Sequence, residues 1–232
     1  MPTVLGRFVE QGARAPAVDA GDLGGDGHVV DATRLRARPR PAPGARHRTA
    51  TVAPMRVIAG TARGRPLKSP RGDRTRPTSD RVRQAVFNAL GSAVPLVDAV
   101  VADLFAGTGA LGIEALSRGA AHAVFVDDDA AARRLIAENL RTCGFADRAE
   151  VRGGDAVAVA ATLGPLDIAF CDPPYRFERW AELLTVLDAG LVVVESDREV
   201  ALPDRWELVR SKRYGSTVVL FAAPAASRAP HG

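Results

Sequence analysis

Strand-like and helix-like segments alternate from residue 99 to residue 196, and this alternation constrains the fold more than any other feature. The strand-like segments are short and rich in Val, Ile and Ala, whereas the segments between them repeat apolar residues at helical spacing. Such alternation predicts an α/β fold, in which helices pack on both faces of a parallel sheet. The predicted strands are 99–105, 121–127, 149–153, 166–172 and 191–196, and the predicted helices are 110–119, 130–143, 155–163 and 178–188.

Two further extended segments, 206–212 and 216–223, follow this alternation and are separated by a short turn. They predict an antiparallel hairpin at one edge of the sheet. The complete sheet would then have seven strands, mostly parallel, and end in that hairpin. We assign this domain to residues 80–223 and expect residues 224–232 to be a loose tail.

Residues 1–54 are rich in Ala, Arg, Gly and Pro and show no lasting apolar period, so we expect them to be disordered. Patterned sequence begins directly at Met55, which raises the hypothesis that translation starts there. Residues 55–79 predict a basic β-hairpin extension with strands at 56–59 and 65–68. The tip of this extension would present Arg63 and Arg65.

A helix is predicted to follow the extension, because Thr78 or Ser79 can cap it and apolar residues recur after them at helical spacing. One face of this helix would pack on a core, while polar residues point elsewhere. The core positions are Val82, Ala85, Val86, Ala89 and Leu90, and the polar ones are Arg81, Gln84 and Asn88.

Charge is distributed unevenly along the chain. Residues 55–83 carry 9 basic and 2 acidic side chains, whereas residues 84–232 carry 14 basic and 20 acidic ones. A basic segment ahead of an acidic body is typical of a protein that binds a polyanion at one end, so we predict nucleic-acid binding here. A solvated charged face is the alternative.

Several other classes of protein are disfavoured. No segment approaches the ~20 apolar residues that a membrane helix requires, and the first residues lack the pattern of a secretory signal. The two cysteines, Cys143 and Cys171, are too few for a disulfide framework, and no Cys/His cluster suggests a metal site. We therefore expect a soluble, cytoplasmic and monomeric protein that binds neither a membrane nor a metal.

A glycine-rich segment, DLFAGTGALGIEAL, connects the first predicted strand to its helix. Phe105, Gly107 and Gly109 lie in this turn, and the glycines allow a ligand to approach the backbone closely. Together with Gly112 they also satisfy the GxGxxG pattern of dinucleotide sites, which is a weak signal by itself. A tight turn without a ligand is the alternative.

Carboxylates near this turn favour S-adenosylmethionine as the ligand. Asp103 is placed to meet the cationic amino group of a methionine moiety and would repel a pyrophosphate. Asp127, or its neighbour Asp128, can accept hydrogen bonds from the ribose hydroxyls, as in both adenosylmethionine and NAD sites. Asp155 could accept from the adenine amino group beside the backbone of Ala156, or could simply cap a helix.

The strongest functional signal is LDIAFCDPPYRF, in which an apolar strand leads directly into Asp172, Pro173, Pro174 and Tyr175. An exocyclic amine on a base is a poor nucleophile, because its lone pair is delocalised into the ring. Two acceptors that bind its hydrogens, here Asp172 and the Pro173 carbonyl, favour the pyramidal form that can attack a methyl group. Tyr175 would stack on the flipped base. An ordinary proline-rich turn is the alternative.

A sheet of this kind with a terminal hairpin is characteristic of the class I methyltransferases. The chain from Met55 to about Phe221 resembles the RsmD family, which methylates a guanine amino nitrogen (N2) in 16S ribosomal RNA. The resemblance rests on MRVIAGTARGRPLKSP, TRPTSDRVRQAVFNAL, DLFAGTGALGIEALSRGA, FVDDD, DPPY and YGST, of which TRPTSDRVR is the most discriminating.

The resemblance implies a class I Rossmann-like fold, S-adenosyl-L-methionine as cofactor and a partly assembled small ribosomal subunit as substrate. It implies that Arg76, Pro77 and Thr78 line the mouth of the site, and Arg63, Arg65 and Arg81 would contact RNA beside them. The family usually has Glu where Asp127 stands, and it lacks residues 1–54. The implied cofactor residues are Asp103, Gly107, Gly109, Asp127 and Asp155, and Asp172 to Tyr175 would hold the base.

Other functions remain open. DPPY does not distinguish guanine from adenine, so the substrate could be DNA adenine or another RNA. A protein glutamine methyltransferase would typically carry Asn in place of Asp172. GTGALG and Asp127 would fit an NAD-dependent oxidoreductase, but that function does not explain DPPY. A non-catalytic RNA-binding module would not need the intact Gly107, Gly109 and Asp172.

Overall fold

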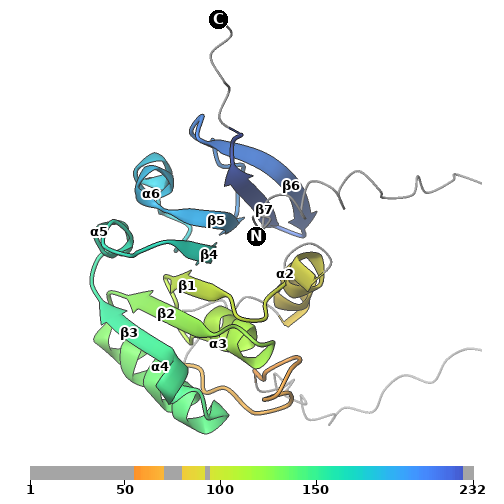
Figure 1. Cartoon of the computed structure of the whole chain (residues 1–232), viewed down its shortest axis with the longest axis vertical. Coiled ribbons are helices and arrows are strands. Elements are labelled where there is room, and N and C mark those ends of the chain that lie inside the picture. The colour runs from red at the N-terminus through yellow and green to blue at the C-terminus, as the bar shows by residue number, and fades with distance from the viewer. Residues whose placement is uncertain (1–54, 71–79, 92–94, 227–232) are drawn as a thin grey trace, which may run out of the picture. The chain divides into compact units, whose positions relative to one another are not determined.

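The computed structural model of the protein describes residues 55–70, 80–91 and 95–226. Figure 1 shows a twisted sheet flanked by helices. Its strands are β1 (Val100–Leu104), β2 (His122–Asp127), β3 (Ala149–Gly153), β4 (Leu166–Cys171), β5 (Ala189–Ser196), β6 (Trp206–Tyr214) and β7 (Thr217–Pro224). The helices are α2 (Asp80–Gly91), α3 (Ala110–Ser117), α4 (Ala130–Cys143), η1 (Ala146–Arg148), α5 (Ala156–Ala160) and α6 (Trp180–Val186).

The seven strands form one sheet in the order β3-β2-β1-β4-β5-β7-β6. Strands β1 to β5 pair in parallel, whereas β7 runs antiparallel to both β5 and β6. The predicted mostly parallel sheet with a terminal hairpin is therefore confirmed. Every strand and helix that the alternation predicted is present.

Both faces of the sheet are buried because consecutive strand residues point to opposite sides. In β4, Ile168 and Phe170 belong to the core that includes residues of α2, α3 and α4. Ala169 and Cys171, the residues between and after them, belong to the core on the other face, with residues of α5 and α6. This two-sided burial explains why the parallel strands are nearly continuous apolar segments.

Helix α2 begins where the sequence predicts, although its expected caps, Thr78 and Ser79, lie outside the described residues. Val82, Val86 and Leu90 are buried as expected, while Ala85 and Ala89 are only partly buried. Phe87 and Arg83 also lie on the buried face. Arg81, Gln84 and Asn88 are exposed.

The extension differs from the predicted hairpin. Its two arms pair only around one antiparallel bridge, between Arg56 and Pro66, where the Val57 amide donates to the Arg65 carbonyl at 3.0 Å and the Leu67 amide to the Met55 carbonyl at 2.8 Å, and neither arm forms a longer strand. The reason lies in the partners of its amides. Ile58 and Ala59 donate to the carboxylate of Glu114 on α3, at 2.7 and 3.0 Å, so these groups do not form cross-strand bonds.

Buried polar groups fix the extension to the domain. Ser117 on α3 accepts from the Thr61 amide through its carbonyl and from the Ala62 amide through its hydroxyl. The buried guanidinium of Arg83 donates to the Arg56 carbonyl and to Asp80. Burial lowers the pKa of Arg83, because loss of water around the guanidinium disfavours its charged form.

None of the helices in the described ranges is long and apolar enough to cross a bilayer.

Replacing Gly60 by Ala should release the extension from α3. A Cβ at this position would lie 1.8 Å from the Ser117 carbonyl oxygen, and the φ of Gly60 is +83°. Gly64→Ala is a matched control, because its φ is +82° but its Cβ would meet nothing within 4 Å. We expect Gly60→Ala to reduce the free energy of unfolding by about 1–3 kcal/mol more than Gly64→Ala in urea titrations. Equal effects would mean that the close contact does not constrain the fold.

Candidate active site

The register of the sheet aligns the ends of its central strands. Leu104 at the end of β1 pairs with Val126 of β2 and with Cys171 of β4, and Cys171 pairs with Val194 of β5. The next residue of each strand therefore emerges at the same edge. Strand order reverses between β1 and β4, which is where open α/β sheets bind ligands. The aligned residues are Phe105, Asp127, Asp172 and Glu195.

The glycine-rich turn after β1 depends on left-handed backbone conformations. Gly107 has a φ of +55° and Gly109 of +77°, and Phe105 has the same sign at +68°. A Cβ on Gly107 would meet nothing within 4 Å, so space lies over the turn. By contrast, a Cβ on Gly112 would lie 2.3 Å from the ring of Phe125. Gly107 thus leaves room for a ligand, whereas Gly112 permits close packing of α3 on the sheet.

Asp127 at the end of β2 holds this turn in place. One carboxylate oxygen accepts from the Gly107 amide at 2.7 Å and the other from the Asp129 amide at 2.9 Å. Burial is the main factor that raises the pKa of Asp127. The alternative candidate, Asp128, is exposed and its carbonyl accepts from Arg133. Asp127 is thus the one that contacts the glycine-rich turn, and the choice between Asp127 and Asp128 as ribose acceptor stays a prediction.

Asp103 lies beneath the turn and is only 2% exposed. Its carboxylate accepts from the Gly112 amide at 2.9 Å, which directs it toward α3. Burial, together with the nearby charges of Asp172 and Asp127, raises the pKa of Asp103 to about 8. Three carboxylates therefore converge on this edge, which favours a cationic ligand and opposes an anionic one.

Asp155 caps a helix, which the sequence allowed as the alternative to an adenine-binding role. One oxygen accepts from the Ala158 amide at 3.0 Å and caps α5, in which Ala156 is the first residue. The other oxygen accepts from Arg179 at 2.9 Å. An adenine amino group would share a carboxylate that already has two partners, so a cofactor role for Asp155 stays a prediction.

The DPPY segment begins directly after β4. Asp172 is partly buried, Pro173 is buried, Pro174 is exposed and Tyr175 is 50% exposed at the rim. The Phe177 amide donates to the Pro174 carbonyl at 2.9 Å, which closes a turn without using the carbonyl of Pro173.

Aromatic contacts link this turn to the glycine-rich turn. The ring of Phe177 lies 5.0 Å from that of Phe105 and 5.1 Å from that of Trp180, in edge-to-face arrangements. No sequence pattern distinguished Phe177 from other aromatic residues. In the structure it connects the two loops that are predicted to hold the cofactor and the base.

The predicted RNA-binding residues are placed in different environments. Arg63 is exposed and, with Arg56, Asp80 and Gln84, lines a pocket of about 390 Å³ between the extension and α2. Arg81 is exposed on α2. Arg65 donates to the Thr142 carbonyl near the end of α4, so at least part of its guanidinium has a structural role. Arg76, Pro77 and Thr78 lie outside the described residues.

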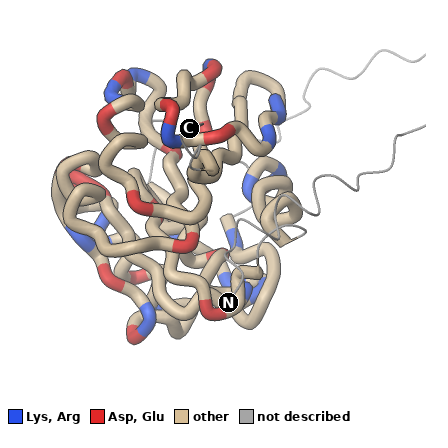
Figure 2. The backbone as a smooth tube through the Cα atoms, turned by 45° about the horizontal axis from the view of Figure 1, so that its top comes forward, with Lys and Arg blue, Asp and Glu red and all other residues tan. Residues whose placement is uncertain are grey.

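Basic side chains that the sequence interpretation did not select occur on the terminal hairpin. Figure 2 shows Lys and Arg positions both on α2 and along this hairpin. On the edge strand β6, Arg210, Lys212 and Arg213 are exposed. A signal was present in the sequence, since WELVRSKRY carries these charges at close spacing.

Asn139 is a second residue that the sequence interpretation missed. It is fully buried on α4, accepts from the Lys68 amide at 2.8 Å, and donates to the carbonyls of Lys68 and Thr108 at 3.1 and 2.9 Å. One side chain thus connects the basic extension to the glycine-rich turn. Its position one turn after Ile136 and one turn before Cys143 was the available signal, because both are core residues.

No group of metal-binding side chains is found in the part of the chain that the structure describes. Both cysteines are buried and free, and burial raises the pKa of the Cys171 thiol well above its usual range. This thiol therefore remains protonated and does not act as a nucleophile.

The model of the family described as "Conserved hypothetical protein 95" matches residues 55–223. The chain belongs to this family. It is 41% identical over 172 residues to "Ribosomal RNA small subunit methyltransferase D" of Escherichia coli K12, an alignment that covers 69% of this chain and 85% of that protein. It is 40% identical over 180 residues to YlbH of Bacillus subtilis 168, covering 71% and 96%. The solved structure of yhhF from Escherichia coli has a TM-score of 0.66 and 38% identity, covering 75% of this chain and 99% of that one.

Truncating Asn139 should weaken cofactor binding through the glycine-rich turn. Asn139→Ala removes the contacts to Lys68 and Thr108, which should cost about 1–3 kcal/mol in unfolding free energy and lower the affinity for S-adenosylhomocysteine. The adjacent Glu138→Ala is the control, because its exposed salt bridge to Lys68 joins the same elements without reaching the turn. Calorimetric titration gives the affinities. Equal affinity in wild type and Asn139→Ala would contradict the link.

Cofactor affinity should increase with pH up to about 8, because a cationic ligand favours the ionised form of Asp103. The pKa of Asp103 is raised to about 8 in the free protein, so binding below that pH must release a proton. S-adenosylhomocysteine affinity, measured from pH 6 to 9, should therefore rise toward pH 8 and fall above it, because the ligand's own α-ammonium group, with an ordinary pKa of about 8, then loses its proton. Asp103→Asn should flatten this profile, whereas an unchanged slope in that variant would assign the pH dependence to another group.

Proposed function

We propose that the protein transfers a methyl group from S-adenosylmethionine to the exocyclic N2 of a guanine in 16S ribosomal RNA of the small subunit. The observation that carries this proposal is the placement of DPPY at the end of β4, directly beside the glycine-rich turn that follows β1. The identity of 41% to a small-subunit ribosomal RNA methyltransferase supports the choice of substrate.

The residues present fit the proposed cofactor. The carboxylates of Asp103 and Asp127 lie where the cationic groups of the cofactor would bind, and a cation beside Asp103 would favour its ionised form over the protonated one that burial favours. The space over Gly107 leaves room for a ligand against the backbone. S-adenosylmethionine supplies a methyl group on a positively charged sulfur, which is an electrophile that needs no metal. The binding roles of Phe105, Gly109, Asp128, Asp155 and Ala156 remain part of this proposal.

Asp172 and Pro173 would act on the attacking amine. The Asp172 carboxylate and the Pro173 carbonyl accept its two hydrogens and orient its lone pair toward the methyl carbon. A nitrogen–carbon bond forms as the carbon–sulfur bond breaks, and the methylated nitrogen loses one proton to Asp172 or to solvent. Because Asp172 is only partly buried, that proton can pass on to water. In-line positioning would lower the activation free energy of methyl transfer by roughly 7–11 kcal/mol.

Tyr175 would hold the base in this geometry. Its ring is 50% exposed at the rim of the site, where a flipped guanine can stack on it. Base–aromatic stacking contributes about 1–3 kcal/mol per base. The rigid Pro173–Pro174 pair fixes the position of the ring relative to Asp172.

The basic surfaces would bind the RNA backbone. Arg63 and Arg81 are exposed on the extension and α2, and Arg65 adds charge beside them. Phosphate contacts of this kind position the protein and weaken with salt, whereas the base is selected in the site. The substrate would be a partly assembled small subunit, and the enzyme would act on it as a monomer in the cytoplasm.

Asp172→Ala should abolish methyl transfer and leave cofactor binding nearly unchanged, because in the proposed mechanism Asp172 would contact the amine and not the adenosine. The assay supplies labelled S-adenosylmethionine and small-subunit particles from cells that lack this protein. We expect a loss of at least about 100-fold in rate, and S-adenosylhomocysteine affinity within about twofold of wild type. Glu178→Ala, an exposed change just beyond the turn, is the control and should remain active.

An NAD-dependent oxidoreductase is the competing function, since GTGALG and Asp127 also fit a dinucleotide. The converging carboxylates oppose a pyrophosphate. S-adenosylhomocysteine should therefore raise the melting temperature of the protein and NAD should not. Stabilisation by NAD alone, or full transfer activity in Asp172→Ala, would refute the proposed function.

A further inference from the structure

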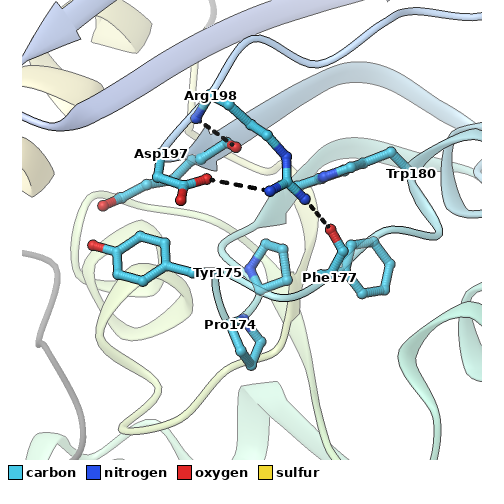
Figure 3. Close-up of a pocket in the computed structure, with 9 residues that line it drawn as sticks. Pro174, Tyr175, Phe177, Trp180, Asp197 and Arg198 are labelled. Carbon is cyan, nitrogen blue, oxygen red and sulfur yellow. Dashed lines mark hydrogen bonds and ion pairs between the residues drawn. The ribbon is translucent and has the colours of Figure 1, made fainter.

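The groove beside DPPY has a second wall that the mechanism above does not use. Pro174 and Tyr175 form one side and residues after β5 form the other, and the space between them is shallow, about 10 Å³, so a base would lie over it and not inside it. Figure 3 shows Asp197 and Arg198 across the groove from these two residues, with the carboxyl group of Asp197 on the same side as the Tyr175 ring. A base that stacks on Tyr175 would therefore present one of its edges to Asp197 and Arg198.

Hydrogen bonds hold this second wall in position. The guanidinium of Arg198 donates to the Phe177 carbonyl at 3.0 Å, which connects the turn after β5 to the turn after β4. The backbone amide of Arg198 donates to the Ser196 hydroxyl at 3.2 Å. A second nitrogen of the same guanidinium lies 4.0 Å from a carboxylate oxygen of Asp197. The groove thus places an acceptor, Asp197, next to a donor, Arg198.

Bases that carry an amino group differ in the ring atom beside that group. In guanine the neighbour of N2 on the Watson–Crick edge is N1–H, a donor, and the next group is O6, an acceptor. In adenine and cytosine the ring nitrogen beside the amine is an acceptor. A carboxylate next to the reacting amine therefore pairs only with guanine, because the other two bases would direct a lone pair at it.

We propose that Asp197 selects guanine by accepting a hydrogen bond from N1–H, while Arg198 donates to O6. This inference rests on the proposed function and adds the basis of base selection to it. Along one edge of guanine, N2 would meet Asp172 and Pro173. N1–H would meet Asp197, and O6 would meet Arg198. A site built to pair with a substrate N–H rejects an analogue that lacks it.

The test compares guanine with 2-aminopurine, which keeps the amine on the same carbon but has a lone pair at N1 and no oxygen at C6. Small-subunit particles are assembled with either base at the nucleotide that the enzyme methylates. The wild type should prefer guanine by about 100-fold in kcat/KM. The side-chain amide of Asp197→Asn can donate to the N1 lone pair of 2-aminopurine. This variant should therefore reduce the guanine preference in kcat/KM by about tenfold or more, chiefly by losing activity on guanine.

Glu199→Gln is the matched control, since Glu199 is exposed two residues further along and does not line the groove. It should keep the wild-type preference. Asp197 is itself exposed, so its substitution should leave the melting temperature unchanged. An Asp197→Asn enzyme with the wild-type preference would overturn the selection role alone. A wild-type enzyme that methylates neither particle would overturn the proposed function together with it.

Discussion

The parallel pairing of β1 with β4 is the constraint on which the rest of the site depends. These strands are distant in sequence, yet their register places the residues after Leu104 and Cys171 side by side. The glycine-rich turn and DPPY therefore face each other across the point where strand order reverses. The edge-to-face contact between Phe105 and Phe177 then fixes the distance between the two loops. A methyl donor and a methyl acceptor can be held in line only if this distance is fixed.

Carboxylates gather at this edge at an energetic cost. Burial raises the pKa of both Asp103 and Asp127, so each is destabilised in its charged form when the site holds no cation. The Gly107 and Gly112 amides offset part of that cost by donating to these two side chains. A cationic ligand would offset more of it, which gives a physical reason for the acidic residues to lie here.

Much of the fold follows from the sequence because the alternation of strands and helices is a local, periodic signal. DPPY and the glycine-rich turn were also evident, since each is a compact motif next to a predicted strand. The docking of the extension was not, because its contacts join residues more than 50 positions apart, such as Ile58 with Glu114 and Lys68 with Asn139. A Glu or Asn on a helix is ordinarily solvated, so helical spacing could place Asn139 on the buried face of α4 but could not identify the partner that either side chain binds. The predicted hairpin is present only as a short antiparallel pairing around Arg56 and Pro66, because Glu114 takes the next amides along the chain, those of Ile58 and Ala59.

The proposed methylation of a guanine amino group in small-subunit ribosomal RNA can be tested directly in cells. The most direct measurement is nucleoside mass spectrometry of 16S ribosomal RNA from bacteria with the gene, without it, and with it restored. We expect one N2-methylguanosine to disappear on deletion, with other methylated nucleosides unchanged, and to return on restoration. An unchanged amount of N2-methylguanosine in the deletion strain, or the loss of a methyl group from a different base, would refute the proposed function.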